Sequence, residues 1–262
     1  MDNKPKKKFG QNFLTDKNLL KKIVDSARIK DQNVLEIGPG RGALTQFLVK
    51  DAKTYLGYEI DTTLQSTLSS YLNDHVTIVY KDFLAASVEE DLNEVFGQEP
   101  VHLVGNLPYY ITTPIIFKFL EIKIIHTATI MVQKEVADRL ISSKNEKSYN
   151  ALSAILQYFT KVTKVVDVNK KMFFPVPKVD SAVIRLEKRP SRTQKETLYV
   201  QFVKAAFLHK RKQMVNNLAE AFAISKQEIQ DWLIALGYPI TVRAEALSIE
   251  AFINLVEAWP FI

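Results

Sequence analysis

A glycine-rich turn lies between two apolar segments near the start of the chain. NVLEIG at 33–38 has the composition of a short buried strand, ALTQFLVK at 43–50 has that of a helix, and the residues from Gly38 to Gly42 separate them. Glycine lets the backbone turn sharply and approach a ligand closely. This order of strand, turn and helix predicts the first unit of an open α/β sheet.

The alternation of apolar strand-like and helix-like segments continues along the chain. We expect further strands at 54–60, 76–80, 101–106 and 127–133, with late strands at 162–168 and 180–187. Predicted helices lie at 62–72, 114–120 and 149–160, and Asp16 is the expected N-cap of a helix that runs to Arg28. Such alternation favours a mostly parallel sheet with helices on both faces.

The last part of the sequence has a different character. The segment at 186–196 is charged, contains a proline and has no hydrophobic period, so we interpret it as a linker. The residues beyond it have helical patterns, with Ser225 and Ser248 as N-caps and Gly237 as a C-cap. The sequence therefore predicts two domains, an α/β domain at 1–187 with a basic N-terminal arm and a small all-α domain at 188–262.

The net charge of +6 is unevenly distributed. Residues 1–8 hold four lysines and one aspartate, residues 9–184 are balanced, and residues 185–217 hold nine basic and two acidic residues, whereas the remaining residues are acidic. A basic block beside a neutral body suggests a polyanionic partner such as a nucleic acid.

Composition excludes several classes of protein. The absence of cysteine excludes disulfides, thiolate metal sites and a cysteine nucleophile, and it fits a reducing compartment. The four histidines lack the spacing of metal ligands, so we expect no metal. No apolar run reaches the ~18 residues that span a bilayer, and no apolar stretch follows the basic start as in a secretory signal. We therefore expect a cytoplasmic protein with no membrane partner.

Four residues follow successive predicted strands at their carboxyl ends: Gly38, Glu59, Asp82 and Asn106. In an open α/β sheet, ligands bind at this edge. Glu59 has the position to accept both hydroxyls of a ribose, and Asp82 could accept from the amino group of an adenine. The glycine turn also satisfies the relaxed dinucleotide pattern, so a nicotinamide enzyme and a strand–turn–helix without a ligand both remain open interpretations.

The segment Asn106-Leu107-Pro108-Tyr109 supplies groups suited to chemistry on an aromatic amine. The amino group of adenine is a poor nucleophile because its lone pair is delocalised into the ring. The Asn106 side-chain carbonyl and a nearby backbone carbonyl could accept its two hydrogens and turn the lone pair outward. Pro108 stiffens the turn, and Tyr109 offers a ring for stacking. Positioning and electrostatics would then supply the rate without a strong base.

Five segments in order resemble the bacterial small-subunit rRNA adenine N6,N6-dimethyltransferase family: FGQNFLTD at 9–16, EIGPGRGALT at 36–45, NLPYYITTPI at 106–115, MVQKEVADRL at 131–140 and FFPVPKVDSAVIRL at 173–186. The resemblance implies a Rossmann-like sheet and S-adenosylmethionine as methyl donor. It implies two adjacent adenosines in the 3′-terminal hairpin loop of 16S rRNA as the target, within the immature small subunit, and a monomeric enzyme.

The resemblance also implies roles for individual residues. Asn12 and Leu14 would form a lid over the cofactor, and Gly38, Glu59, Asp82 and Asn106 would contact it. Asn106 and the Leu107 carbonyl would hold the target amine, while Tyr109 and Phe173 would close on the two faces of the base, with the neighbouring Phe174 as the alternative. Separately from the resemblance, the charge pattern predicts that basic residues of the 185–217 block bind RNA phosphates; they are Arg185, Lys188, Arg189, Lys204, Lys210, Arg211 and Lys212.

Two related classes remain as alternatives. The large-subunit rRNA methyltransferases of antibiotic resistance usually have isoleucine at the position of Leu107. Other relatives keep the fold and serve as ribosome-assembly factors without catalysis, and the intact segment from Asn106 to Tyr109 weighs against that alternative.

Overall fold

The computed structural model describes residues 5–6 and 9–261, which form two compact units. The first unit contains the described residues up to 137 together with 163–188, and the second contains 138–162 and 189–261. Within these described residues, no helix is both long enough and apolar enough to cross a membrane.

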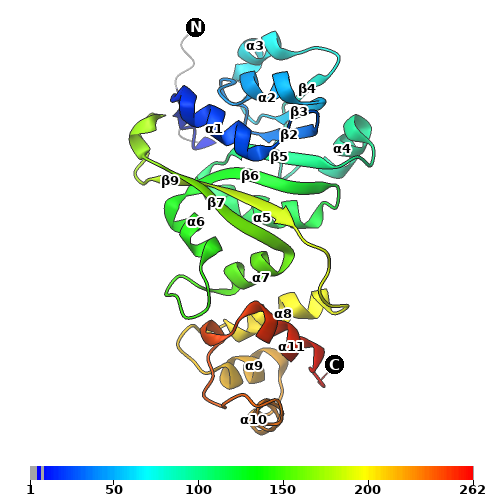
Figure 1. Cartoon of the computed structure of the whole chain (residues 1–262), viewed down its shortest axis with the longest axis vertical. Coiled ribbons are helices and arrows are strands. Elements are labelled where there is room, and N and C mark those ends of the chain that lie inside the picture. Colours follow the sequence, from blue (N-terminus) through cyan, green and yellow to red (C-terminus); the bar gives the residue numbers. More distant parts are fainter. Residues whose placement is uncertain (1–4, 7–8, 262) are drawn as a thin grey trace. The chain divides into compact units, whose positions relative to one another are not determined.

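A seven-stranded sheet organises the first unit (Figure 1). Its order is β4–β3–β2–β5–β6–β9–β7, and β2, β3, β4, β5 and β6 pair in parallel, whereas β9 runs antiparallel to β6. The strands span β2 (Asn33–Ile37), β3 (Thr54–Tyr58), β4 (Val76–Val79), β5 (Val101–Asn106), β6 (Ile125–Gln133), β7 (Thr160–Val168) and β9 (Ser181–Lys188). The predicted α/β class is confirmed, and the order in which strands join the sheet reverses between β2 and β5, because β3 and β4 lie on one side and β6 lies on the other.

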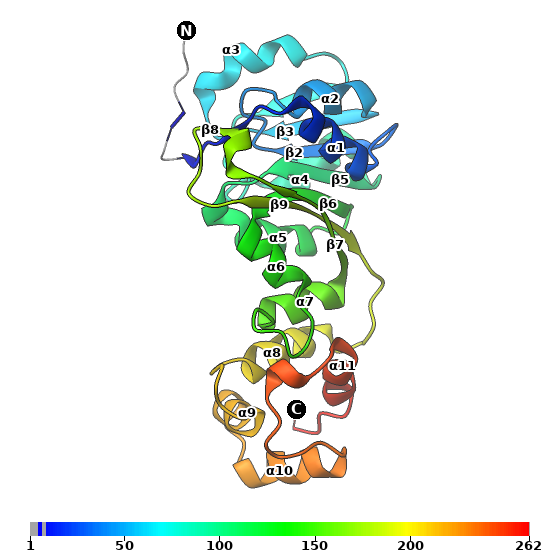
Figure 2. The same cartoon turned by 60° about the vertical axis from the view of Figure 1, so that its left-hand side comes forward.

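Helices cover both faces of this sheet (Figures 1 and 2). One face carries α1 (Lys17–Ala27) and α2 (Thr45–Asp51), and the other carries α4 (Val88–Phe96) and α5 (Thr112–Glu121). Asp16 caps α1 by accepting from the Leu19 amide at 2.8 Å, as expected, and the helix ends at Arg28. Apolar residues spaced three and four apart on α1, such as Leu20, Ile23 and Val24, are buried, which anchors it.

A second, two-stranded sheet brings distant parts of the chain together. Strand β1 (Phe13–Leu14) pairs antiparallel with β8 (Phe173–Phe174), so that Phe13 lies opposite Phe174 and Leu14 opposite Phe173. The Thr15 amide also donates to the Met172 carbonyl at 3.2 Å. The segment at 9–14 is thereby fixed next to the sheet.

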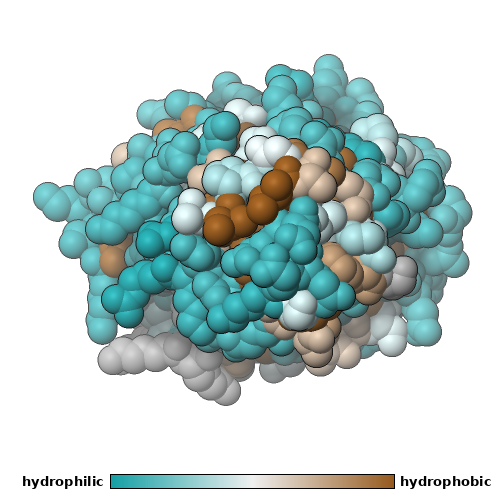
Figure 3. Space-filling view, turned by 90° about the horizontal axis from the view of Figure 1, so that it is seen from below, coloured by the Kyte–Doolittle hydropathy of each residue, from teal (hydrophilic) through white to brown (hydrophobic). Residues whose placement is uncertain are grey.

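The second unit is built from helices. It contains α7 (Ala151–Phe159), α8 (Glu196–Ala206), α9 (Met214–Phe222), α10 (Lys226–Ala235) and α11 (Ile249–Glu257), and α6 (Lys134–Ile141) leads into it. Its core is aromatic: the fully buried Phe202 packs against Phe252, Trp232 and Trp259. Figure 3 shows that the face of this unit around α10 is mostly hydrophilic around a short hydrophobic strip.

Several elements differ from the sequence-based expectation. The expected helix at 62–72 is a four-residue helix, α3 (Gln65–Leu68), between two 3₁₀ turns. Residues 138–162 pack with the C-terminal helices, because Tyr158 stacks on Tyr199 with ring centroids 4.1 Å apart. The expected linker is short and held in place: β9 continues to Lys188, and Thr193 is buried. The division into functional domains at 187/188 stays a prediction.

Candidate active site

A cavity opens at the carboxyl ends of the parallel strands in the first unit. It contains about 1140 Å³ of free space, part of it open to solvent. Its wall includes every residue expected to contact a cofactor and the expected methyl-transfer segment, although these come from four strand ends and the N-terminal arm. They are Asn12, Leu14, Gly38, Glu59, Asp82, Asn106, Leu107, Pro108 and Tyr109.

The glycine turn forms the floor of the cavity after β2. Gly38 has φ +73° and Gly40 has φ +60°, a region that other residues rarely adopt. A Cβ atom on Gly40 would lie 3.2 Å from the ring of Phe13, so the arm packs directly on this turn. The Gly40 amide donates to a Glu59 carboxylate oxygen at 2.8 Å. The turn and the end of β3 are therefore fixed to each other.

The Glu59 carboxylate lies at the end of β3 and is buried. One oxygen accepts from the Gly40 amide and the other from the Asp61 amide, each at 2.8 Å. Burial raises the pKa of Glu59, although these backbone hydrogen bonds lower it. Because each carboxylate oxygen has further lone pairs, Glu59 can still accept from the hydroxyls of a bound ligand.

The arm is attached to the sheet through Asp61. Lys6 Nζ lies 2.6 Å from one oxygen of this carboxylate, and Gln11 Nε2 donates to the other at 2.9 Å. Burial raises the pKa of Asp61, but the hydrogen bonds from Lys6, Thr63 and Gln11 outweigh it and hold the pKa at about 2. An ionised Asp61 thus fastens the arm beside Glu59. The sequence interpretation missed this contact, because Lys6 and Asp61 are far apart in the chain.

The loop after β4 forms a side wall. Asp82 Oδ1 accepts from the Leu84 amide at 2.9 Å, which leaves the second carboxylate oxygen for a ligand. The neighbouring Phe83 is buried and packs edge-on against Tyr58, with ring centroids 5.4 Å apart. The loop therefore combines an acceptor with an apolar surface, which suits a heterocyclic base.

Glu36 is a further acidic group at the cavity, and the sequence interpretation assigned it no role. It lies on β2, is 1% exposed, and accepts from Thr45 at 2.7 Å and from Tyr55 at 2.5 Å through the same oxygen. Burial raises its pKa to about 7, even though these two hydrogen bonds lower it. An acidic residue among the apolar residues of a predicted buried strand was the sequence feature that could have identified Glu36.

The segment after β5 brings its polar groups to the cavity. Asn106 Nδ2 donates to the backbone carbonyl of Asn12 at 3.0 Å. Because a carbonyl can only accept, this contact identifies the amide nitrogen and leaves Oδ1 as the acceptor. The Pro108 carbonyl is used by the Ile111 amide at 3.2 Å, and the Tyr109 hydroxyl lies 2.8 Å from that of Ser181. The Tyr109 ring is thus held as a wall.

The structure places Phe173 outside the lining of the cavity. Its side chain is 3% exposed and packs in the core with Leu14, and its stacking on a base stays a prediction. Phe174 is 59% exposed, and the peptide bond between it and Pro175 is cis. Successive residues of a strand point to opposite sides, so the pairing of β8 with β1 buries one ring and exposes the other. Tyr110, 62% exposed at the cavity rim, is a second aromatic group that the sequence interpretation did not use.

Two of the expected RNA contacts are internal. Arg185 is 8% exposed, and its Nη1 donates to the carbonyls of Ser26 and Ala27 at the end of α1. Lys188 Nζ donates to the Ile122 carbonyl at 2.7 Å, and burial lowers its pKa to about 8. Since both cations satisfy buried carbonyls, we withdraw them from the proposed RNA-binding set.

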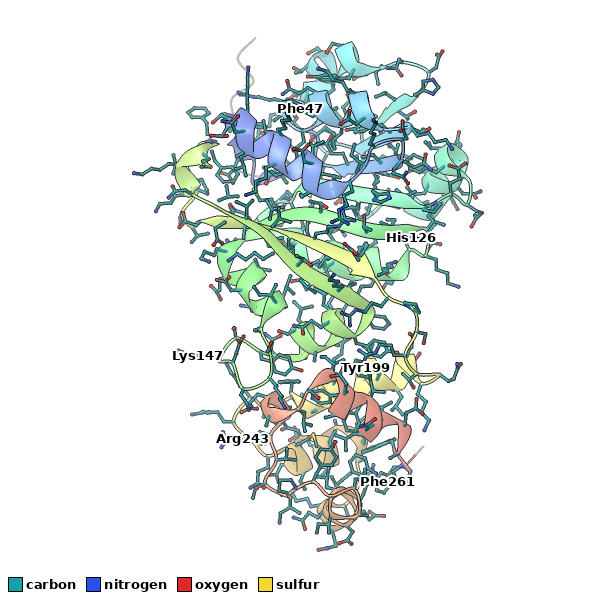
Figure 4. All side chains as sticks on the ribbon, in the orientation of Figure 1. Phe47, His126, Lys147, Tyr199, Arg243 and Phe261 are labelled. Atoms are coloured by element: carbon teal, nitrogen blue, oxygen red, sulfur yellow. The ribbon has the colours of Figure 1, made fainter. Side chains whose placement is uncertain are left out.

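The other expected RNA contacts lie on the surface of the second unit. Arg189, Lys204, Lys210, Arg211 and Lys212 are exposed, and the last three lie on a loop between α8 and α9 rather than on a helix. The loop that carries Lys147 lies beside this one, because Lys210 Nζ donates to the Lys147 carbonyl at 3.4 Å. A third loop, which carries Glu245, lies beside the Lys147 loop, because the Asn145 amide donates to the Glu245 carbonyl at 2.8 Å. Figure 4 shows Lys147 and Arg243 on the same side of this unit.

No group of three or more histidine, cysteine, aspartate or glutamate side chains within 5–6 and 9–261 is arranged to hold a metal ion. The cavity instead presents carboxylates and amide groups, which suit an organic ligand with hydroxyl, amino and positively charged groups.

Comparison with known proteins gives extensive matches. The family model described as ribosomal RNA adenine dimethylase matches residues 2–259. A ribosomal RNA small subunit methyltransferase A of Onion yellows phytoplasma (strain OY-M) is 47% identical over 264 residues, covering 99% of this chain and 97% of the relative. A dimethyladenosine transferase structure from Plasmodium falciparum has a TM-score of 0.77 at 25% identity, with 95% of this chain and 100% of that chain covered. The 23S rRNA methyltransferase ErmE has a TM-score of 0.72 at 28% identity, with 94% and 99% covered.

Proposed function

Because the chain belongs to the ribosomal RNA adenine dimethylase family, we propose that the cavity at the carboxyl ends of β2 to β5 is its active site. The protein is an S-adenosylmethionine-dependent methyltransferase that forms N6,N6-dimethyladenine in ribosomal RNA. The phytoplasma relative, a ribosomal RNA small subunit methyltransferase, supports the small-subunit RNA as the target. Our proposed substrate is the pair of adjacent adenosines in the 3′-terminal hairpin loop of 16S rRNA, modified in immature subunits by a cytoplasmic monomer without a metal.

The residues of the cavity fit S-adenosylmethionine. Glu59 would accept from the ribose hydroxyls and Asp82 from the adenine amino group, while Gly38 lets the backbone approach the methionine part. The carboxylates of Glu59 and Asp82 at the cavity favour a ligand that carries positive charge. Asn12 and Leu14 would close over the ligand, since the arm is fastened to Asp61.

When bound, S-adenosylmethionine supplies a methyl carbon on a positively charged sulfur. The side-chain oxygen of Asn106 and the Leu107 carbonyl would accept the two hydrogens of the target amine and aim its lone pair at that carbon. Tyr109, fixed by Ser181, would lie against one face of the base, and the exposed Phe174 is the candidate for the other face. Catalysis would come from positioning and from pre-set acceptors rather than from a strong base.

The second unit would hold the RNA through phosphate contacts. Lys210, Arg211 and Lys212 lie next to the loop that carries Lys144 and Lys147, so cations from separate loops form one exposed basic surface. Arg243, on a third loop, extends it. Such contacts bind any sequence and weaken with salt, so the cavity would select the base, which enters after it is flipped out of its stack.

The observation that carries this proposal is the Asn106 amide, whose nitrogen is held by Asn12 so that its oxygen serves as the acceptor at the cavity. The test is incubation of immature small subunits with labelled S-adenosylmethionine, followed by nucleoside digestion. We expect N6,N6-dimethyladenosine from small subunits and none from naked large-subunit rRNA. Label in large-subunit rRNA would overturn the target, and no transfer to any RNA would overturn the activity.

A further inference from the structure

We propose that Lys118 is a positioning residue that holds the loop carrying Asp82 in the shape needed to recognise adenine. Lys118 lies on α5, whereas Asp82 and Phe83 lie between β4 and α4. The inference rests on the proposed contact between Asp82 and the adenine ring of the cofactor, and it adds a residue that does not line the cavity.

The Lys118 ammonium donates to three backbone carbonyls of a single loop. Nζ lies 2.6 Å from the Phe83 oxygen, 3.2 Å from the Leu84 oxygen and 3.1 Å from the Ala86 oxygen. A lysine ammonium has three N–H donors and no acceptor, so each donor has one partner here. Nζ also lies 5.1 Å from the centroid of the Phe83 ring, within the range of a cation–π contact.

The same loop is folded around Asp82. Its side chain accepts from the Leu84 amide, and its backbone carbonyl accepts from the amides of Ala85 and Ala86 at 3.1 and 2.9 Å. The amide groups of the loop therefore point toward Asp82, and three of its carbonyls point toward Lys118. The two sets of hydrogen bonds belong to one loop conformation, so losing one weakens the other.

Three carbonyl oxygens directed at one point repel one another unless a cation lies between them. Burial lowers the pKa of Lys118, although Asp82, Glu121 and Glu89 raise it. Lys118 is also two turns along the helix that begins directly after the segment 106–111. A single side chain thus connects the loop proposed to hold the adenine with the helix that follows the methyl-transfer segment.

The first test replaces Lys118 by methionine, which keeps the stem and removes the donors. We expect the Kd and KM for S-adenosylmethionine to rise by about tenfold and kcat to change little, because contacts to the adenine are equally strong in the ground and transition states. Lys118→Arg keeps the charge but spreads the donors in a plane, so it should restore affinity in part. An unchanged Kd in Lys118→Met would overturn the inference.

Lys188→Met is the matched control. This lysine, at the end of β9, also donates to a backbone carbonyl and lies over a ring, Phe119, at 4.9 Å, but neither Lys188 nor its partner Ile122 lines the cavity. We expect a lower Tm with an unchanged Kd. Loss of cofactor affinity equal to that of Lys118→Met would show that any buried lysine of the unit has the same effect, and would overturn a specific role.

The decisive measurement compares S-adenosylhomocysteine with S-inosylhomocysteine, which carries an oxygen in place of the adenine amino group. The wild-type protein should prefer the adenine compound, and in Lys118→Met this preference should fall toward one, because Asp82 is no longer held. A retained preference in Lys118→Met would overturn this inference alone. Failure of the wild-type protein to bind S-adenosylhomocysteine would overturn the proposed function as well.

Discussion

The side-chain nitrogen of Asn106 donates a hydrogen bond of 3.0 Å to the backbone carbonyl of Asn12. This contact joins the end of β5 to the N-terminal arm. It orients the amide so that the oxygen, which is the only acceptor of the group, is left for the target amine in the mechanism that we propose. The arm therefore positions the side chain of Asn106 in addition to lining the cavity.

The contact predicts different results for two substitutions of Asn106. Asn106→Ala removes the acceptor and should lower kcat by about 10²-fold to 10³-fold, with a smaller loss of cofactor affinity. Asn106→Asp places a carboxylate oxygen against the Asn12 carbonyl, so it should also release the arm. Hydrogen exchange of residues 9–14 should rise in Asn106→Asp.

Gln157→Glu is the control for this comparison. Gln157 Nε2 donates to the carbonyls of Leu140 and Ser142 in the second unit, so its replacement also removes an amide donor from backbone carbonyls. Exchange in the arm should stay as in the wild type. Equal exchange in Asn106→Asp and the wild type would contradict the role of the contact.

The two adjacent phenylalanines should separate stability from activity. Phe173→Ala removes a buried ring and should destabilise the protein by about 3–5 kcal/mol in urea unfolding. Phe174→Ala changes an exposed ring and should alter stability by less than about 0.5 kcal/mol, while turnover on RNA falls. Full turnover in Phe174→Ala would exclude this ring from base stacking.

The contact between Lys6 and Asp61 should control how long the cofactor stays bound. Asp61→Asn removes the charge that both Lys6 and Gln11 contact, so S-adenosylhomocysteine should dissociate about tenfold faster in stopped flow, given ~1.5 kcal/mol for a hydrogen bond to a charged group. The pKa of Asp61 is about 2 in the folded protein, below its ordinary 3.8. The ionised carboxylate therefore stabilises the folded state fully above about pH 4, and this stabilisation is lost as the pH falls through 2.

Glu99→Gln serves as the control for Asp61→Asn. Glu99 also pairs with a lysine at 2.6 Å, but both side chains of that pair are more than half exposed. Its dissociation rate should match that of the wild type. A wild-type rate in Asp61→Asn would mean that the arm does not retain the cofactor.

Glu36 should make the stability of the folded protein depend on pH. Its pKa is about 7 in the folded protein against an ordinary 4.5, so the folded state binds the proton more tightly. The stabilisation that Glu36 contributes is fully present below about pH 4.5 and is lost as the pH rises through 7, by up to about 3 kcal/mol. Glu36→Gln keeps an acceptor for Thr45 and Tyr55 and should remove most of this decrease. Parallel stability curves of variant and wild type would contradict it.

The basic surface should determine the salt dependence of RNA binding. Alanine at Lys210, Arg211 and Lys212 together should reduce the slope of log K against log salt by about two to three, because each phosphate contact contributes about 0.7 to 0.9. Arg185→Met should lower the Tm without changing this slope, since Arg185 binds the end of α1. A reduced slope in Arg185→Met would return that residue to the interface.

The cavity residues at the strand ends were predictable because parallel strands bring their carboxyl ends to one edge. The order of the strands along the chain was enough to predict that four residues share the cavity: Gly38, Glu59, Asp82 and Asn106. The burial of Phe173 was not predictable, because the side on which a strand residue points depends on register, here the pairing of β8 with β1. Phe173 and Phe174 are the same residue type on opposite sides of β8, so residue type alone does not distinguish the buried ring from the exposed one.

Contacts between distant residues were not predictable from local pattern. Arg185 adds to the net positive charge of the 185–217 block, which suggested a surface position. In the structure its side chain is buried, because it donates to two backbone carbonyls at the end of α1. The three carbonyls around Lys118 belong to a loop more than 30 residues earlier in the chain. The basic residues at 210–212 continued a helical pattern, whereas the chain forms a loop there between α8 and α9.

The pairing of β1 with β8 has a consequence for the order of events during synthesis. Phe13 and Leu14 are made early, but their partners Phe174 and Phe173 follow about 160 residues later. The arm lacks this strand pairing until the ribosome has added those residues, even though β2 to β5 and the contacts of the arm with Asp61 and Asn106 can already have formed. A nascent chain therefore completes the wall of the cavity late in translation, and stalled or truncated chains that end before Phe173 would hold the arm by fewer contacts.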